Sequence, residues 1–363
     1  MKKKERIAIL TAGGDCPGLN AVIRAVTKKA ILDYQMEVVG IEDGYDGLIH
    51  NRHKKLDILA ASGILTLGGT ILGTSNTANP YRYPLKKGKK VEFKDLSAQV
   101  IQNIKKLGLD ALVCVGGDGT MRIADRLSNQ GIPIVGIPKT IDNDIKGTDV
   151  TFGFDSAVSI ATEGIDRIHT TAMSHHRAMI IEVMGRNAGW IALYSGVAGG
   201  GDILLLPEIP YDIKVIAERV KARHKKGKRF SIIVAAEGAR PKKGSVVVKR
   251  RVADGSEPLR LGGIGFVLAN QIEQTTEIES RTVMIGHLQR GGSPTAFDRI
   301  LGTQLGAKAV DLIAEKRFGR MVAVQGIKIA DVDLKVAASG TRLVPPGHAL
   351  IETARSIGAI FGD

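Results

Sequence analysis

Short apolar runs alternate with longer amphipathic stretches through the first half of the chain. The runs have the length of buried strands, and the stretches after them carry apolar residues at helical spacing. Strands that alternate with helices predict a parallel, doubly wound α/β sheet, whose ligands bind beyond the carboxyl ends of the strands. The predicted strands cover residues 6–11, 38–41, 110–115 and 132–137, and the predicted helices cover residues 20–34, 95–107 and 121–127, the first capped by Asn20.

A second α/β pattern begins near residue 153. Its predicted helices cover residues 157–169 and 263–275, and its predicted strands cover residues 178–183, 231–235 and 282–286. Residues 239–262 are rich in Lys, Arg, Gly and Pro, which indicates an exposed excursion. A chain of 363 residues exceeds the size at which one hydrophobic core usually stops growing. The sequence therefore predicts two doubly wound (Rossmann-like) parallel-sheet domains.

Charge and cysteine content narrow the class of protein. The chain has 51 Lys and Arg against 37 Asp and Glu, a formal net charge of +14, which suggests nucleic-acid binding. Only 4% of its residues are aromatic, however, so we expect no nucleic-acid partner, and a positive surface also suits phosphorylated substrates. Cys16 and Cys114 are the only cysteines, which predicts free thiols in a reducing compartment. No apolar span reaches about 18 residues, so we expect a cytoplasmic protein without a membrane segment.

The sequence Gly-Gly-Asp-Gly-Thr at 116–120 directly follows a predicted strand. Its three glycines let backbone N–H groups close on an anion, and the next helix would direct its positive N-terminus at the same point. Asp118 is the natural carboxylate for a divalent cation that bridges phosphates. Taken alone, this run fits kinases that phosphorylate sugars, lipids or dinucleotides, and an ordinary strand-to-helix turn is the alternative.

Two aspartates flank Asn143 at the exit of the next predicted strand. In an extended turn, period-two alternation would place the carboxylates of Asp142 and Asp144 on one side. With Asp118 nearby, a metal ion or raised pKa values must relieve the shared negative charge. One carboxylate would then accept the proton of an attacking hydroxyl, while the other supports the metal or the positioning. The alternative is an Asx-rich turn stabilised by its own backbone.

Basic side chains recur at predicted strand ends in the second half of the chain. They are Arg177, Arg186, Arg281 and Arg290, with His287 on the last loop. The bidentate guanidinium suits a phosphate monoester, so the group predicts a sugar-phosphate pocket, although each arginine alone is more typical of the surface. Glu237, after another predicted strand, is a candidate acceptor for sugar hydroxyls.

Four motifs together resemble the 6-phosphofructokinase family. They are Gly-Gly-Asp-Gly-Thr at 116–120, Pro-Lys-Thr-Ile-Asp-Asn-Asp at 138–144, Met-Gly-Arg at 184–186 and Gly-His-Leu-Gln-Arg-Gly-Gly at 286–292. Their order and spacing match that family over nearly the whole length. The resemblance implies magnesium-dependent transfer of a phosphoryl group from ATP to the 1-hydroxyl of fructose 6-phosphate. A lipid or dinucleotide kinase would not explain the second and fourth motifs.

The resemblance also implies the domain division, with the active site between the domains. Residues 1–153 with 288–337 would form the larger, donor-binding domain, and residues 154–287 with 338–363 the smaller, sugar-phosphate-binding domain. Arg177 and Arg281 resemble residues that family members donate across a subunit boundary. We therefore expect a homo-oligomer, either a tetramer or a dimer.

Individual roles follow from the same resemblance. Asp142 is similar to the general base, Arg186 to the residue that bridges the phosphates of both substrates, and Asp118 to the magnesium ligand. Donor-site residues by this resemblance are Gly14, Tyr45, Gly117, Asp118, Gly119 and Thr120, with the ring of Tyr45 offered to a nucleobase. Sugar-phosphate residues are Thr140, Ile141, Asp142, Met184, Gly185, Arg186, Glu237, His287, Leu288, Gln289 and Arg290, and Lys139 and Thr140 join the catalytic group.

Departures from the familiar bacterial pattern bear on the phosphoryl donor. Asn76 stands where many members have an arginine that reaches the donor phosphates, and Arg82 is a candidate substitute. Lys139 is typical of pyrophosphate users, whereas Gly119 is the residue of ATP users. An aspartate at 119 would occupy and repel the place of the α-phosphate, so we predict ATP, with Lys139 neutralising the leaving phosphate. A pyrophosphate-dependent enzyme and a non-catalytic sugar-phosphate-binding regulator stay open as alternatives.

Overall fold

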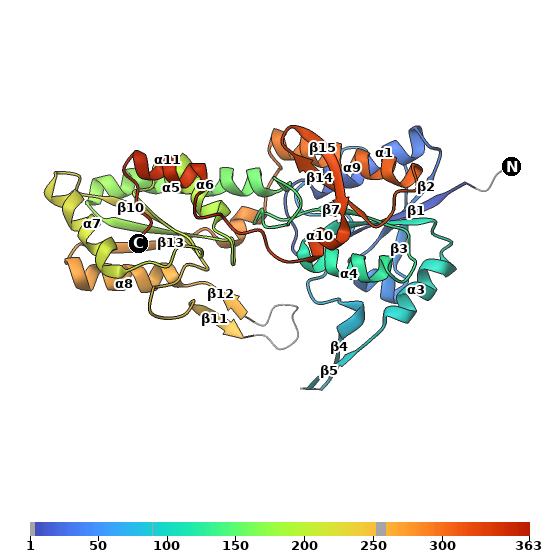
Figure 1. Cartoon of the computed structure of the whole chain (residues 1–363), viewed down its shortest axis with the longest axis horizontal. Helices are drawn as coiled ribbons and strands as arrows, with labels where there is room; N and C mark the ends of the chain where they lie inside the picture. The colour runs from blue at the N-terminus through green and yellow to red at the C-terminus, as the bar shows by residue number, and fades with distance from the viewer. Residues whose placement is uncertain (1–3, 89, 252–258) are drawn as a thin grey trace.

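A computed structural model describes residues 4–88, 90–251 and 259–363 and contains two separate sheets (Figure 1). The larger sheet has seven strands among the described residues, in the order β15-β14-β7-β6-β1-β2-β3. Their bounds are β1 Arg6–Thr11, β2 Glu37–Ile41, β3 His53–Leu56, β6 Ala111–Gly116, β7 Ile134–Pro138, β14 Arg320–Gln325 and β15 Lys328–Asp333. Only the two edge strands, β3 and β15, run antiparallel to their neighbours.

Helices cover both faces of the larger sheet, so its central strands are apolar on both sides. In β1, Ile7 and Ile9 face one layer, whereas Ala8 and Leu10 face the other. The first layer contains α1 (Leu19–Leu32) and α9 (Ala296–Ala314), which pack against each other along one face (Figure 1). The opposite layer contains α2 (Tyr45–His50), α3 (Ser97–Lys106), α4 (Asp118–Ser128) and α10 (Leu334–Ala338).

The smaller sheet is parallel throughout, in the order β13-β8-β10-β9. Its strands are β8 Ala178–Val183, β9 Ile203–Leu205, β10 Ser231–Ala236 and β13 Ser280–Met284. One face packs on α5 (Phe154–His175), α6 (Trp190–Ala198) and α11 (Ala349–Ser356), and the other on α7 (Ile213–Lys225) and α8 (Ile264–Thr276). In the described ranges no helix is long and apolar enough to cross a bilayer.

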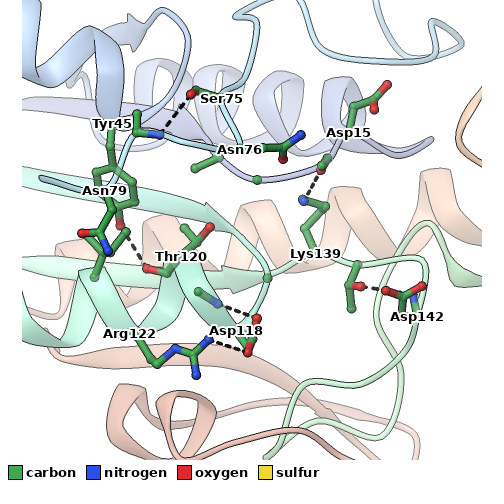
Figure 2. Close-up of a pocket in the computed structure, with 18 of the residues that line it drawn as sticks. Asp15, Tyr45, Ser75, Asn76, Asn79, Asp118, Thr120, Arg122, Lys139 and Asp142 are labelled. Carbon is green, nitrogen blue, oxygen red and sulfur yellow. Dashed lines mark hydrogen bonds and ion pairs between the residues drawn. The ribbon is translucent and has the colours of Figure 1, made fainter. Parts of the chain in front are cut away.

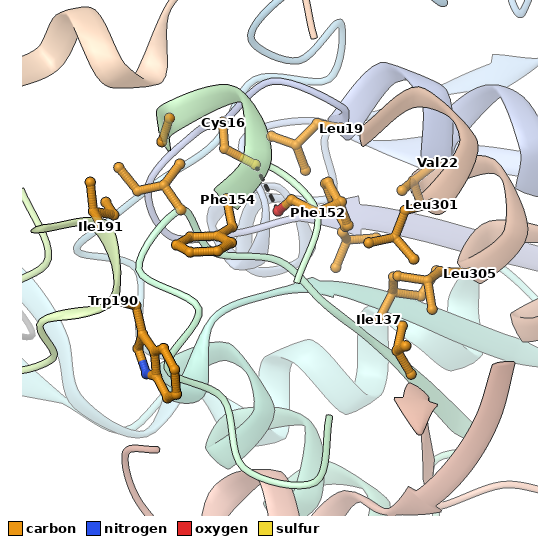
Figure 3. Close-up of a cluster of buried hydrophobic side chains, with 14 of the residues drawn as sticks. Cys16, Leu19, Val22, Ile137, Phe152, Phe154, Trp190, Ile191, Leu301 and Leu305 are labelled. Carbon is orange, nitrogen blue, oxygen red and sulfur yellow. Dashed lines mark hydrogen bonds between the residues drawn. The ribbon is translucent and has the colours of Figure 1, made fainter. Parts of the chain in front are cut away.

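The apolar core is continuous where the two sheets meet. Leu19 and Leu301, which belong to the larger half, share one buried cluster with Phe152, Phe154 and Trp190 (Figure 3). The chain passes through this junction between β7 and α5, again between β13 and α9, where η2 (Gly286–Arg290) lies, and finally between α10 and α11. A shared core of this kind holds the loops that carry the polar site in fixed relation to one another.

Two antiparallel hairpins extend from opposite halves of the molecule on the same side (Figure 1). The first joins β4 (Tyr83–Lys87) to β5 (Lys90–Lys94), after the short helix η1 (Pro80–Arg82), and the second joins β11 (Val248–Arg251) to β12 (Leu259–Leu261). The predicted excursion over residues 239–262 is therefore partly a hairpin, and its residues 252–258 lie outside the described residues.

The prediction that Asn20 caps the first helix is wrong. Gly18, with a left-handed φ of 102°, is the N-cap residue of α1, and the buried Asn20 side chain lies within the first turn. Its amide nitrogen donates to the carbonyls of Leu67 and Gly68 at 3.0 and 3.2 Å, while its oxygen accepts from the N–H of Ile71 at 2.8 Å. Asn20 therefore fixes a loop that lies far away in the sequence.

Candidate active site

A cavity of about 400 Å³ opens at the carboxyl ends of the larger sheet's central strands (Figure 2). The loops after β1, β6 and β7 form its floor, as expected for a doubly wound sheet. Arg186 and Arg290 approach from the side of the smaller sheet. The other lining residues belong to positions 12–15, 45, 75–82, 117–126 and 139–144.

The glycine-rich loop after β6 leads straight into α4. The helix begins at Asp118, earlier than the predicted residue 121, so Asp118, Gly119 and Thr120 form its first turn. The N–H groups of this turn, which lack partners within the helix, and the positive end of the helix dipole thus face the cavity, an arrangement that binds phosphate. A Cβ built on Gly119 meets no atom within 4 Å, so the space beside this residue is open.

Asp118 already has partners in this first turn. One carboxylate oxygen accepts from the N–H of Gly119 at 2.6 Å, and the other pairs with Arg122 at 2.8 Å (Figure 2). Within residues 4–88, 90–251 and 259–363, no group of three or more His, Cys, Asp or Glu side chains is arranged to hold a metal. Magnesium bound mainly through phosphates and water needs only one or two carboxylates. Asp118 and Asp144, which line the same cavity, fit that requirement.

The loop after β1 is held by two cations. The ammonium of Lys139 donates to the carbonyl of Gly14 (Figure 2), and the guanidinium of Arg290 lies over the same glycine. A Cβ on Gly14 would stand 2.9 Å from an Arg290 nitrogen, so a side chain there would displace the guanidinium from this position. Burial lowers the pKa of Lys139. The ammonium of Lys139 and the guanidinium of Arg290 therefore both lie beside the cavity that the first turn of α4 faces.

Tyr45 does not offer its ring to a nucleobase as predicted. The residue borders the cavity, but it is only 2% exposed, and its hydroxyl donates to the carbonyl of Thr120 at 3.0 Å (Figure 2). Burial raises the pKa of this hydroxyl well above its ordinary value. Tyr45 therefore supports the glycine-rich loop through this hydrogen bond, and its burial leaves no free ring face for a ligand.

Asp142 and Asp144 both reach the cavity, but the turn that carries them is not extended as predicted. Asn143 between them adopts a left-handed φ of 51°, and its side-chain oxygen accepts from the N–H of Thr151 at 3.0 Å. The N–H of Asp142 donates to the hydroxyl of Thr140 at 3.1 Å (Figure 2). The local side-chain hydrogen bonds of this turn thus bring the two carboxylates together.

The two carboxylates are unusually basic. Burial, and then the negative charge of Glu237, raises the pKa of Asp142 to about 6. Burial, and then the charges of Asp142 and Asp118, raises the pKa of Asp144 to about 7. Asp142 Oδ1 is buried and has no hydrogen-bond partner among the described residues. An unpaired buried carboxylate oxygen in a cavity is a good acceptor for a substrate proton.

Of the predicted sugar-phosphate residues, Thr140, Ile141, Asp142, Arg186 and Arg290 line the cavity. Gly185 and Arg186 have positive φ values of 135° and 51°, and the N–H of Arg186 donates to Glu237 at 3.2 Å. Burial raises the pKa of Glu237. Gln289 is fully buried, and its side-chain oxygen accepts from the N–H of Met184 at 2.8 Å. Gln289 therefore holds this loop from inside, and its side chain does not face the cavity.

The other predicted substrate residues are not among those that line the cavity, namely Arg177, Met184, Gly185, Glu237, Arg281, His287, Leu288 and Gln289. His287 and Leu288 are exposed on η2. Arg177 and Arg281 lie at the amino ends of β8 and β13, whereas the site occupies the carboxyl ends, and both pair with Glu279. The chain alone therefore does not bring Arg177 and Arg281 to Asp142.

Several residues that line the cavity were not predicted from the sequence to belong to the site. Ser75 and Asn79 come from the loop before β4, and Arg122 and Arg126 project from α4 toward the cavity. The spacing of four between these two arginines, just after the glycine-rich loop, was an available signal because residues four apart share one helix face. The two residues considered above for contact with the donor phosphates, Asn76 and Arg82, also line the cavity. The Arg82 guanidinium stacks on Phe93 at 3.7 Å from the ring centroid.

Comparison with known proteins agrees with this geometry. The phosphofructokinase family model matches residues 6–313. The chain is 54% identical to ATP-dependent 6-phosphofructokinase 2 of Clostridium perfringens, covering 100% of both chains. It is 49% identical to ATP-dependent 6-phosphofructokinase 3 of Bacteroides thetaiotaomicron, covering 98% of this chain and 100% of that one. The structure of Pichia pastoris phosphofructokinase in the T-state aligns with a TM-score of 0.80 and 31% identity, covering 93% of this chain and 36% of that chain. The chain therefore belongs to the phosphofructokinase family.

Proposed function

We propose that this protein is an ATP-dependent 6-phosphofructokinase, which transfers the terminal phosphoryl group of ATP to the 1-hydroxyl of fructose 6-phosphate. One observation carries the proposal. Asp142, one of whose carboxylate oxygens is buried without a partner, lines the same cavity as the first turn of α4, so a proton acceptor and a phosphate-binding turn share one space. The names of the relatives that match the full length agree with it.

The residues of the cavity divide the work between them. Asp142 would accept the proton of the sugar hydroxyl as it attacks, with Thr140 and Ile141 shaping the turn around it. Arg186 would neutralise charge on the phosphates of both substrates, and Lys139 would do so at the leaving phosphate. Met184, Gly185, Glu237 and Arg290 would orient the sugar phosphate. Most of the catalytic power would come from positioning and charge.

The donor would bind through Gly14, the N-cap residue Gly117 and the first turn of α4, residues 118–120. Asp118, supported by Asp144, would hold the magnesium ion. This ion would supply positive charge between the donor phosphates. The raised pKa of Asp144, caused by burial and then by its acidic neighbours, is the electrostatic sign that a cation is favoured there.

The decisive experiment is a coupled assay for fructose 1,6-bisphosphate with ATP, magnesium and fructose 6-phosphate. Turnover would support the proposal. Lack of product with ATP and with pyrophosphate would instead favour a regulator that binds the sugar phosphate without reacting. We also propose a cytoplasmic location, which two free buried cysteines fit.

We further propose that the working enzyme is a homo-oligomer in which Arg177 and Arg281 reach the sugar phosphate of a neighbouring subunit. Both guanidiniums are held near each other by Glu279, at the end of the sheet remote from their own cavity. We expect Arg281→Ala and Asp142→Asn each to be nearly inactive alone. Mixing the two under conditions of subunit exchange should restore activity well above their sum, since one hybrid site then has both groups intact. A mixture no more active than its components would contradict the shared site.

The pH dependence of activity and of stability should run in opposite directions. Because Asp142 must be ionised to act as a base, we expect kcat/KM to fall below about pH 6. The folded pKa values of Asp142 and Asp144 exceed the value of about 3.9 in an unfolded chain, so the folded state binds more protons between these limits. The free energy of unfolding should therefore rise as the pH falls from about 7 toward 5. Thermal unfolding without substrate measures this, and a protein that loses stability over that window contradicts it.

A further inference from the structure

A short segment of the C-terminal region runs behind the turn that carries Asp142 and Asp144. This strap, residues 341–344, lies between α10 and α11 and beyond residue 313, where the match to the family model ends. The N–H of Arg342 donates to the carbonyl of Asp144 at 2.7 Å, and Thr341 forms an antiparallel bridge with Ile145. The strap therefore pairs with the backbone of the acidic turn in the manner of a short strand.

The side chain of Arg342 holds the same turn at two further points. One terminal nitrogen donates to the carbonyl of Asn143 at 3.0 Å and to the carbonyl of Asp149 at 2.7 Å. Asn143 is the left-handed residue between the two aspartates, and its side chain is already fixed by Thr151. The side chain of Asn143 is thus held by Thr151 and its carbonyl by Arg342. These two hydrogen bonds restrict the orientation of the neighbouring Asp142.

The other end of the strap is fastened to the smaller half of the molecule. Trp190, the first residue of α6 and only 3% exposed, donates its indole N–H to the carbonyl of Arg342 at 3.0 Å. The guanidinium of Arg342 stacks on the indole ring at 4.3 Å from its centroid. Glu208 accepts from the N–H of Val344 and from the N–H of Gly189, both at 2.9 Å. Figure 3 shows Trp190 beside the core shared by both halves.

We propose that Arg342 is a positioning residue, which sets Asp142 for proton transfer by tying the acidic turn to α6. It belongs to no wall of the cavity, so it would act through Asn143 rather than on the substrate. Displacement of a reacting group by about 1 Å can cost about 10²-fold in rate, and the three hydrogen bonds from Arg342 to the carbonyls of Asn143, Asp144 and Asp149 oppose such a shift. The inference rests on the proposed kinase function.

The test compares Arg342→Ala with Arg355→Ala. Arg355 is a matched control, because it lies in the same C-terminal region, stacks on Phe361 at 4.9 Å and pairs with Asp363 at 2.6 Å, away from the cavity.

For Arg342→Ala we expect kcat to fall about 10- to 100-fold, with KM for ATP within about threefold of the parent. Trp190 is the only tryptophan, so its emission should shift to the red as the guanidinium leaves it. Hydrogen exchange at the amide of Thr151 should accelerate. Arg355→Ala should leave all four quantities near the parent.

Arg342→Lys supplies a graded comparison, because an ammonium reaches one carbonyl but cannot stack as a planar fork, so its kcat should lie between those of parent and Arg342→Ala. A kcat within threefold of the parent for Arg342→Ala, with unchanged emission and Thr151 exchange, would overturn the proposal. So would an equal loss in Arg355→Ala. If Arg342→Ala does not fold, Arg342→Lys and Trp190→Phe carry the same kinetic and exchange comparison. A parent without kinase activity would refute the proposed function instead, and Thr151 exchange and Trp190 emission would still decide whether the strap holds the turn.

Discussion

Asp142→Asn is expected to lower kcat by about 10²- to 10⁴-fold, the usual cost of losing a general base. The asparagine amide has nearly the same shape, and the N–H of residue 142 can still donate to Thr140. Fructose 6-phosphate should therefore bind with KM changed by less than about threefold, because the lost interaction forms only as the hydroxyl attacks. Steady-state kinetics together with direct titration of the sugar phosphate separates the two effects.

Asp144→Asn is the matched comparison, since Asp144 shares the turn, the burial and the raised pKa of Asp142. If Asp144 supports the cation, its loss should raise the magnesium concentration needed for half-maximal rate, whereas Asp142→Asn should not. A kcat for Asp142→Asn within about threefold of the parent would show that another group accepts the proton. An Asp144→Asn variant with the larger loss of kcat at saturating magnesium would assign the base to Asp144 instead.

The sequence predicts the strands of this protein well where each is an apolar run between turn residues. The bounds predicted for residues 6–11 and 178–183 coincide with β1 and β8. Parallel strands buried on both faces leave little freedom in length, because a polar residue ends the run. The glycine-rich loop and the acidic turn were also located correctly, since both follow such strands.

Conformation within those loops could not be predicted in the same way. Asn143 was expected in an extended turn, but its left-handed φ depends on Thr151, eight residues later. Tyr45 was expected to face a nucleobase, but its ring is buried and its hydroxyl binds the carbonyl of Thr120. Whether an aromatic ring stacks on a ligand or supports a loop depends on the residues that pack on it. Arg342 gave no sequence signal at all, because its partners at Asn143, Asp149 and Trp190 are distant along the chain. Such contacts exist only once the two halves have been assembled.

We predict that the choice of phosphoryl donor depends on the open space beside Gly119, and Gly119→Asp tests this prediction. The backbone at 119 has no positive φ, and a Cβ there meets no neighbour, so the variant should fold normally. Its carboxylate would instead project into the space that the α-phosphate of ATP needs.

We expect kcat/KM with ATP to fall at least about 100-fold in Gly119→Asp, because two like charges about 4 Å apart repel by about 4 kcal/mol at an effective dielectric constant of 20. Pyrophosphate has no α-phosphate beyond the transferred and leaving groups, so any activity with it should change little. Gly119→Ala is the control that adds bulk without charge, and we expect it to lose less than about fivefold in kcat/KM with ATP, since its methyl group enters open space.

Lys139 is the counter-argument to assigning ATP as the donor, because a buried ammonium beside Gly14 suits the leaving phosphate of either donor. The measurement is kcat/KM for each donor at saturating fructose 6-phosphate and magnesium. A parent enzyme that is more efficient with pyrophosphate than with ATP would reverse the donor assignment, whereas equal losses in Gly119→Ala and Gly119→Asp would show that bulk rather than charge excludes ATP.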